Sequence, residues 1–374
     1  MNNKEKTALQ KEVVDSIEPY TSGRLLLAPR IGKSKLIIDL IKRDKYDSIL
    51  WVTPSAKLAE EDIPREFEIW KGKRFLKKLT TTTWMGLDNI QGHYDLVVFD
   101  EEQFITEANI RPIRMGWLTY NNIISMTGTE TRHEDKLALY KELGLKVIYK
   151  ISINQAVDIG LLSDYSIKVV GVDMSPDKTY KAGTKAKPFL TTEGKNYEYL
   201  SKVIDASPGG KDKMFKIFNR MRAVKNSPSK LTAAKYLINT LPGRRLIFSG
   251  SIAQAELLSK NTYHSKTNGE NLRKFKAGEI DEIAMVNTGG VGETYKAIDH
   301  LIMVQTDSDN NGLTSQKICR TLLSQKGYEA TIWIICLKQT KDVAWVRSTL
   351  QSFDKEKVEY INFKDLKNEN SSRT

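Results

Sequence analysis

Cysteine and histidine are scarce in this chain of 374 residues, which has two of the former and four of the latter. Cys319 and Cys336 are too few for a disulfide framework or a thiolate metal site. The histidines are far apart and lack the spacing of metal ligands; they are His93, His133, His264 and His300. We therefore expect a protein of a reducing cytosol with no metal cage.

Long apolar runs are also missing. The longest, "ATIWIICL" at 330–337, is far shorter than a membrane span, and the opening "MNNKEKTALQ" has no apolar signal-peptide core. We therefore expect no membrane anchor and a cytoplasmic location.

Basic residues outnumber acidic ones, 58 to 46, which gives a formal net charge of +12 and a pI near 9.3. This excess favours a polyanionic partner. Nucleic acid is the leading candidate and an anionic membrane surface is the second.

Short apolar runs alternate with amphipathic stretches at both ends of the chain, which is typical of parallel α/β sheets. The length fits about two domains. We expect a first domain at 1–165, a Lys-rich and partly flexible insertion or linker at 166–229, a second domain at 230–350 and a frayed tail at 351–374. A solvated loop without a role is an equal alternative for the insertion.

The stretch "RLLLAPRIGKSKLIIDL", residues 24–40, predicts a strand, a loop and a helix around Gly32, Lys33 and Ser34. Such a helix start offers N–H groups to a phosphate, Lys33 adds a positive charge, and the Ser34 hydroxyl can ligate Mg²⁺. Leu27 occupies the place of the usual first glycine, so this motif alone is also compatible with chance.

A second motif supports the first. "YDLVVFDEEQ", residues 94–103, predicts a buried strand that ends at Asp100 and Glu101. At that position Asp100 suits Mg²⁺ binding and Glu101 suits orientation of an attacking water. The two motifs together predict a nucleotidase that binds a nucleoside triphosphate and Mg²⁺.

The order of these elements resembles the superfamily 2 helicases and translocases, including Snf2-like and bacteriophage branch-migrating members. The resemblance implies a fold of two tandem RecA-like domains. It also implies that the protein acts in a bacterial cell or in a bacterium infected by a phage. "APRIGKS" is similar to motif I and "DEEQ" to motif II. The resemblance therefore implies that Gln10 recognises the adenine base. The residues implied to contact ATP are Gln10, Arg30, Gly32, Lys33, Ser34, Gln103 and Gly292.

Further segments resemble the motifs that grip nucleic acid: "VTPSAKL" (Ia), "LTTTTWMGL" (Ib), "SMTGTE" (III) and the glycine run near 288–292 (V). The implied contacts are to phosphates rather than to specific bases, and come from Thr53, Ser55, Thr82, Thr83, Gly128, Thr288 and Gly289. Trp84 is a candidate for stacking on a base, with a core aromatic as the alternative.

"RRLIFSG" resembles motif IV and "SQKICRTLL" resembles motif VI, where Gln316 and Arg320 match the family's catalytic positions. Leu323 stands where a second arginine is usual. An arginine finger is worth roughly 10³ to 10⁵ in kcat, so we expect Arg320 to supply this charge.

The resemblance implies an ATP-dependent DNA helicase or translocase that remodels duplex or branched DNA, with hydrolysis in the inter-domain cleft coupled to movement along a strand. One alternative is a nucleic-acid-binding scaffold or accessory subunit with weak or no ATPase, because of Leu323. Another alternative is an RNA helicase.

Overall fold

The computed structural model describes residues 1, 3–128, 130–131, 133–184, 186–286, 295, 297–307, 313–322 and 328–371. These residues form two compact units. Residues 1–162 and 313–319 belong to the first, and the second begins at Ser163. Among the described helices, none has the length and apolar character needed to span a bilayer.

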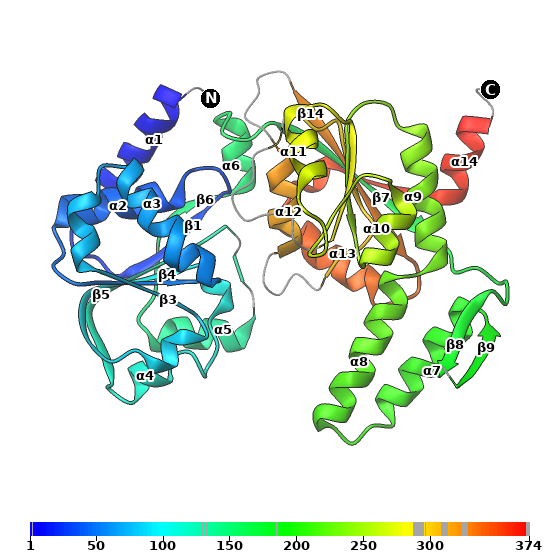
Figure 1. Ribbon diagram of the computed structural model, residues 1–374, viewed down its shortest axis with the longest axis horizontal. Coiled ribbons are helices and arrows are strands. Elements are labelled where there is room, and N and C mark those ends of the chain that lie inside the picture. Colours follow the sequence, from blue (N-terminus) through cyan, green and yellow to red (C-terminus); the bar gives the residue numbers. More distant parts are fainter. Residues whose placement is uncertain are drawn as a thin grey trace. The chain divides into compact units, whose positions relative to one another are not determined.

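The first unit contains a parallel sheet in the order β3-β2-β4-β5-β1-β6 (Figure 1). Its strands are β1 (Gly23–Leu27), β2 (Ile49–Thr53), β3 (Leu79–Thr83), β4 (Gly92–Asp100), β5 (Leu118–Thr127) and β6 (Val147–Ile151). Its helices are α1 (Asn3–Ser16), α2 (Lys33–Asp44), α3 (Ile63–Ile69), α4 (Arg111–Arg114), α5 (Glu134–Glu142) and α6 (Ile153–Asp158).

Burial on both faces explains why these segments form strands. Every residue of β1 and β2 is buried, as expected for the inner strands of a parallel sheet. One core cluster packs Leu50, Val52, Val97 and Phe99 against Trp84 and other apolar residues. The sheet is therefore a rigid base for the loops at its edges.

The second unit contains a parallel sheet in the order β11-β12-β10-β13-β14-β7-β15. Its strands are β7 (Asp164–Val172), β10 (Arg245–Ser249), β11 (Thr262–Tyr263), β12 (Glu282–Val286), β13 (His300–Met303), β14 (Glu329–Leu337) and β15 (Val358–Asn362). Its helices include α9 (Pro228–Thr240), α10 (Ile252–Leu258), α11 (Glu270–Ala277), α13 (Asp342–Leu350) and α14 (Phe363–Ser371). The helix α12 (Leu313–Thr321) belongs to the first unit up to Cys319. The prediction of two parallel α/β sheets is confirmed.

Two segments differ from the sequence prediction. Residues 166–172 lie in β7, between β14 and β15, rather than in the insertion. Residues 358–371 form β15 and α14 rather than a frayed tail. The strand β15 was missed because it is a short edge strand with the exposed residues Glu359 and Tyr360, which leaves little apolar pattern.

The predicted insertion is also more regular than its composition suggests. It contains an antiparallel hairpin of β8 (Tyr180–Thr184) and β9 (Lys187–Thr191), followed by α7 (Glu193–Asp205) and α8 (Gly210–Lys225). The Thr192 hydroxyl caps α7 by accepting a hydrogen bond from the Lys195 N–H. We call residues 173–226 the arm; Figure 1 shows α7 and α8 side by side within it.

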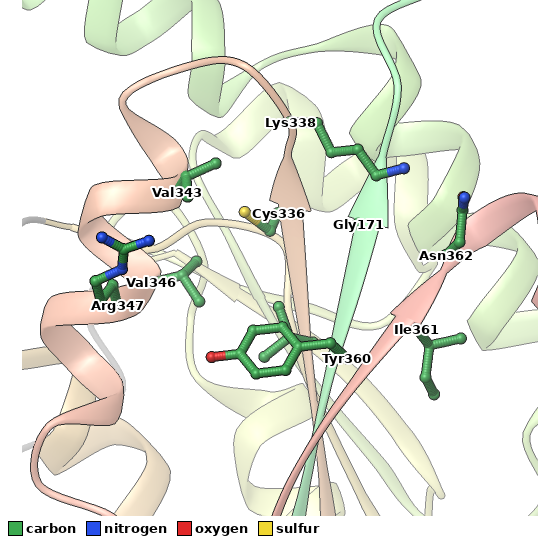
Figure 2. Close-up of a pocket in the computed structure, with 10 residues that line it drawn as sticks. Gly171, Cys336, Lys338, Val343, Val346, Arg347, Tyr360, Ile361 and Asn362 are labelled. Atoms are coloured by element: carbon green, nitrogen blue, oxygen red, sulfur yellow. The ribbon is translucent and has the colours of Figure 1, made fainter. Parts of the chain in front are cut away.

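The second unit also has a groove between α13 and β15, with a volume of about 390 Å³ (Figure 2). Cys336 lies at its floor and Tyr360 at its side. Burial raises the pKa of the Cys336 thiol to about 12, which makes it a poor nucleophile. None of the residues predicted to bind ATP or nucleic acid lines this groove.

Candidate nucleotide-binding site

Three neighbouring strands end at one edge of the first sheet. β5 pairs with both β1 and β4, all in parallel, so their carboxyl ends lie together. The loop with Gly32 follows β1, Asp100 ends β4, and Thr127 ends β5 between them. The sheet order thus brings together two motifs separated by about 70 residues in the sequence.

The loop at Gly32 has a backbone that requires glycine. Gly32 precedes α2 with φ of 88°, and a Cβ there would lie 2.5 Å from Nε2 of Gln10. That nitrogen donates a hydrogen bond of 2.6 Å to the carbonyl of Ile31. The buried Gln10 therefore holds the loop in place, and its role in adenine recognition stays a prediction.

Positive charge concentrates around this loop. Burial lowers the pKa of Lys6 on α1, and repulsion from Arg30 and Lys35 lowers it further. Burial also lowers the pKa of the Arg30 guanidinium. Lys6, which sequence reasoning missed, lies near Gly32. A bound anion would relieve this repulsion, and the N-terminus of α2 adds backbone N–H groups that favour an anion.

Glu101 lies at the centre of a set of hydrogen bonds. Lys33 Nζ lies 2.5 Å from Oε1 of Glu101. Nitrogen atoms of Gln103 and Gln316 each donate to Oε2 at 2.9 Å. Burial alone would raise the pKa of Glu101, but the charge of Lys33 and these hydrogen bonds outweigh it and lower the pKa. The carboxylate is therefore ionised and fixed in orientation.

Asp100 has the opposite environment. Burial, with the neighbouring charge of Glu101 adding to it, raises the pKa of Asp100 to about 7. The Asp100 carboxylate and the partly buried Ser34 hydroxyl are oxygen donors of the kind that Mg²⁺ prefers. No group of three or more His, Cys, Asp or Glu that could form a metal cage occurs within the described ranges. Proteins usually hold Mg²⁺ by one or two carboxylates together with substrate phosphates, so Asp100 and Ser34 are the candidate ligands.

Gln103 links the acidic loop to β5. Its Oε1 accepts a hydrogen bond of 2.7 Å from the Thr127 hydroxyl, while its amide nitrogen contacts Glu101. The chain from Thr127 through Gln103 to Glu101 joins the segments that resemble motifs III and II.

Glu102 forms a buried support that sequence reasoning missed. Its carboxylate pairs with Arg24 of β1 at 2.6 Å, and the two side chains are 1% and 6% exposed. Ser125 of β5 also donates a hydrogen bond to Glu102. The third residue of "DEEQ" therefore fixes the acidic loop to the neighbouring strands.

Two predicted nucleic-acid contacts are corrected by the structure. Thr53 is fully buried, and its hydroxyl donates to the carbonyl of Ser55 at 2.9 Å, so it does not face a ligand. Trp84 is also buried, stacks near Phe99 and donates to the carbonyl of Asp100 at 3.0 Å. The exposed side chain at this turn is Met85, at 90%.

The other predicted contacts of the first unit remain accessible. Ser55 is exposed, and Thr82 and Thr83 are partly exposed. Gly128 lies near the phosphate loop, because a Cβ there would be 3.6 Å from the Leu27 carbonyl oxygen and from Pro29 Cγ. Thr288, Gly289, Gly292 and Leu323 lie outside the described residues, as does the side chain of Arg320, whose backbone belongs to α12.

Comparisons with solved structures define the class of fold. The Pyrococcus furiosus Hef helicase domain aligns with a TM-score of 0.53 at 12% identity, over 91% of this chain and 97% of that one. S. cerevisiae Dbp5 bound to RNA and ADP BeF3 aligns with a TM-score of 0.54 at 9% identity, over 98% and 95%. The chain therefore shares the fold of these two proteins, with two RecA-like parallel α/β sheets. No family model matches the sequence, and no curated protein sequence matches it.

Proposed function

We propose that this protein is an ATP-dependent helicase or translocase that moves along nucleic acid, with DNA as its track. The observation that carries the proposal is the contact between Lys33 and Glu101 at the shared edge of β1 and β4. Lys33 supplies the positive charge that binds the phosphates, and the ionised carboxylate of Glu101 can orient a water. ATP hydrolysis requires both groups close together.

The side chains have separate roles in this proposal. Lys33 binds the β and γ phosphates, with Gly32 and the start of α2 cradling them. Asp100 and Ser34 would hold Mg²⁺, which would neutralise the charge that develops on the phosphates. Glu101 orients the attacking water, and Gln103 and Gln316 hold the carboxylate in place. Arg320 is our candidate for the charge that Leu323 does not supply.

The contact of Lys33 with Glu101 also suggests how ATP triggers the site. Lys33 has one ammonium group, and a triphosphate competes with Glu101 for it. Transfer of Lys33 to the phosphates leaves Glu101 held by the two glutamine amides. The carboxylate then becomes available to a water only when ATP is bound.

Nucleic acid is the proposed partner because the chain has a net charge of +12. In addition, Ser55, Thr82 and Thr83 are accessible at or just after the carboxyl ends of β2 and β3. RNA is a second candidate track, since Dbp5, which shares the fold, is bound to RNA. The comparison supports the choice of nucleic acid but does not choose between the two polymers.

A strand-displacement assay tests the proposal. We expect the protein to separate a fluorescently labelled forked DNA duplex in an ATP-dependent manner. Lys33→Ala should abolish separation while keeping most of the static binding, since binding depends on many basic residues. Full displacement by Lys33→Ala would contradict the proposal, and activity on a forked RNA duplex alone would select the RNA alternative.

A further inference from the structure

The helix α8 exposes its apolar side. Met214, Phe215 and Phe218 are 54%, 61% and 48% exposed, and Val224 is the one buried residue of the helix. These three residues share a face with Lys211 and Arg222, at offsets of three, four, seven and eleven residues from Lys211. A surface helix normally turns such a face toward the core, so this stripe is available to a partner.

Other parts of the arm add exposed rings and apolar side chains. Tyr199 on α7 is 64% exposed, and Phe189 and Leu190 on β9 are each 58% exposed. The helices α7 and α8 pack along each other, and β8 contacts α7 (Figure 1). Large exposed apolar side chains thus gather on one small part of the second unit.

The arm is also rich in basic residues. Residues 173–226 include twelve Lys and Arg and six Asp and Glu, a net charge of +6, which is half of the chain's +12. Lys211, Lys213 and Arg222 form no ion pair with the residues that the structure describes. These cations therefore remain available to an anionic partner.

We propose that the exposed stripe of α8 is a binding site for single-stranded nucleic acid. Phe215 and Phe218 stack on bases, and Lys211 and Arg222 contact phosphates at the two ends of the stripe. At 1.5 Å per residue, Lys211 and Arg222 are about 16 Å apart along the helix, and the two rings about 4.5 Å. Aromatic rings flanked by cations are the features that bind single strands without sequence preference.

The biological role of this site rests on the proposed function. The site lies in the arm, at residues that match none of the helicase motifs, whereas Lys33, Asp100 and Glu101 lie on the first unit. An acidic protein segment is the competing occupant, because apolar and basic side chains also suit protein interfaces. The net positive charge of the arm favours a polyanionic partner. The rings of Phe215 and Phe218 favour nucleic acid over an acidic protein segment, because nucleic acid has bases that can stack on them.

The test measures binding of fluorescein-labelled oligo(dT) to the full chain by anisotropy. We expect Phe215→Leu and Phe218→Leu each to weaken binding about fivefold or more, because leucine keeps the apolar bulk but cannot stack. Tyr360→Leu removes an aromatic ring that is 72% exposed on the same unit outside the arm, and should leave binding unchanged. All three positions are exposed, so a thermal melt should show intact folding.

The charges have their own readout. Replacing both Lys211 and Arg222 with glutamine should reduce the slope of log K against log salt by about 1.4, since each phosphate contact contributes about 0.7 on single strands. Unchanged affinity in both leucine variants would overturn the inference. Equal competition by poly-glutamate and by unlabelled oligo(dT) would also overturn it, because it would show a site that selects charge alone or a protein segment.

ATPase measured both without nucleic acid and with single-stranded DNA, forked duplex DNA or RNA separates this inference from the proposed function. Ring-dependent binding by a protein that hydrolyses no ATP would reject the proposed function and support the site on α8. ATPase activity together with oligo(dT) binding that is unchanged in Phe215→Leu and Phe218→Leu would support the proposed function and reject the site on α8.

Discussion

Glu101→Gln is expected to lower kcat for ATP hydrolysis by about 10²–10⁴-fold, the usual contribution of a positioned acid or base. At about 1.36 kcal/mol per decade this corresponds to about 2.7–5.4 kcal/mol of transition-state stabilisation. Glutamine keeps the shape of the side chain but loses the charge that Lys33, Gln103 and Gln316 stabilise. ATP binding should persist, because Lys33 remains and loses its competing carboxylate.

The control for this variant is Glu107→Gln. Glu107 follows the same strand but its side chain is 81% exposed, so removing its charge should leave kcat unchanged. Steady-state phosphate release and a fluorescent ATP analogue measure turnover and binding separately. Turnover by Glu101→Gln within twofold of the unaltered protein would remove Glu101 from the catalytic role.

Glu102→Ala is expected to reduce the free energy of unfolding by about 3–5 kcal/mol, because it leaves a buried arginine without its partner. Arg24 donates from Nε to Oε1 at 3.0 Å and to Oε2 at 3.1 Å, and from Nη2 to Oε1 at 2.6 Å. The guanidinium also lies 3.9 Å from the ring centroid of Tyr140. Water cannot replace these contacts at a buried position.

The matched control is the exposed pair of Arg114 and Glu142, joined by hydrogen bonds of 2.6 and 2.7 Å with side chains 40% and 41% exposed. Glu142→Ala should cost about 0–1 kcal/mol. A variant with leucine at both 24 and 102 should be more stable than Glu102→Ala, since no charge is stranded. Urea unfolding of all the variants gives the comparison, and equal losses for Glu102→Ala and Glu142→Ala would contradict this account.

The parts of the site that the sequence predicted are those set by local chemistry. A strand that leads into Gly32, Lys33 and Ser34, and another that ends in Asp100, carry their signals within a few residues. The two parallel sheets followed from apolar runs for the same reason. The roles assigned to these residues stay predictions until activity is measured.

The missed residues depend on neighbours that are distant in the sequence. Lys6 approaches the phosphate loop only because α1 packs there, and Arg24 meets Glu102 only because β5 lies between β1 and β4. Trp84 and Met85 have adjacent positions but opposite exposure. A single sequence does not reveal which of two such apolar residues points inward. The sequence pattern did not reveal the apolar stripe on α8, because lysines are interspersed among its aromatic residues.

The most direct measurement is steady-state ATP hydrolysis without nucleic acid and with single-stranded DNA, forked duplex DNA or RNA, with Lys33→Ala as the blank. The account predicts turnover that Lys33→Ala abolishes and that one of these polymers stimulates, with DNA expected as the stimulating polymer. ATP binding without turnover under all four conditions would contradict it, and would indicate a scaffold that keeps the helicase fold without its catalytic activity.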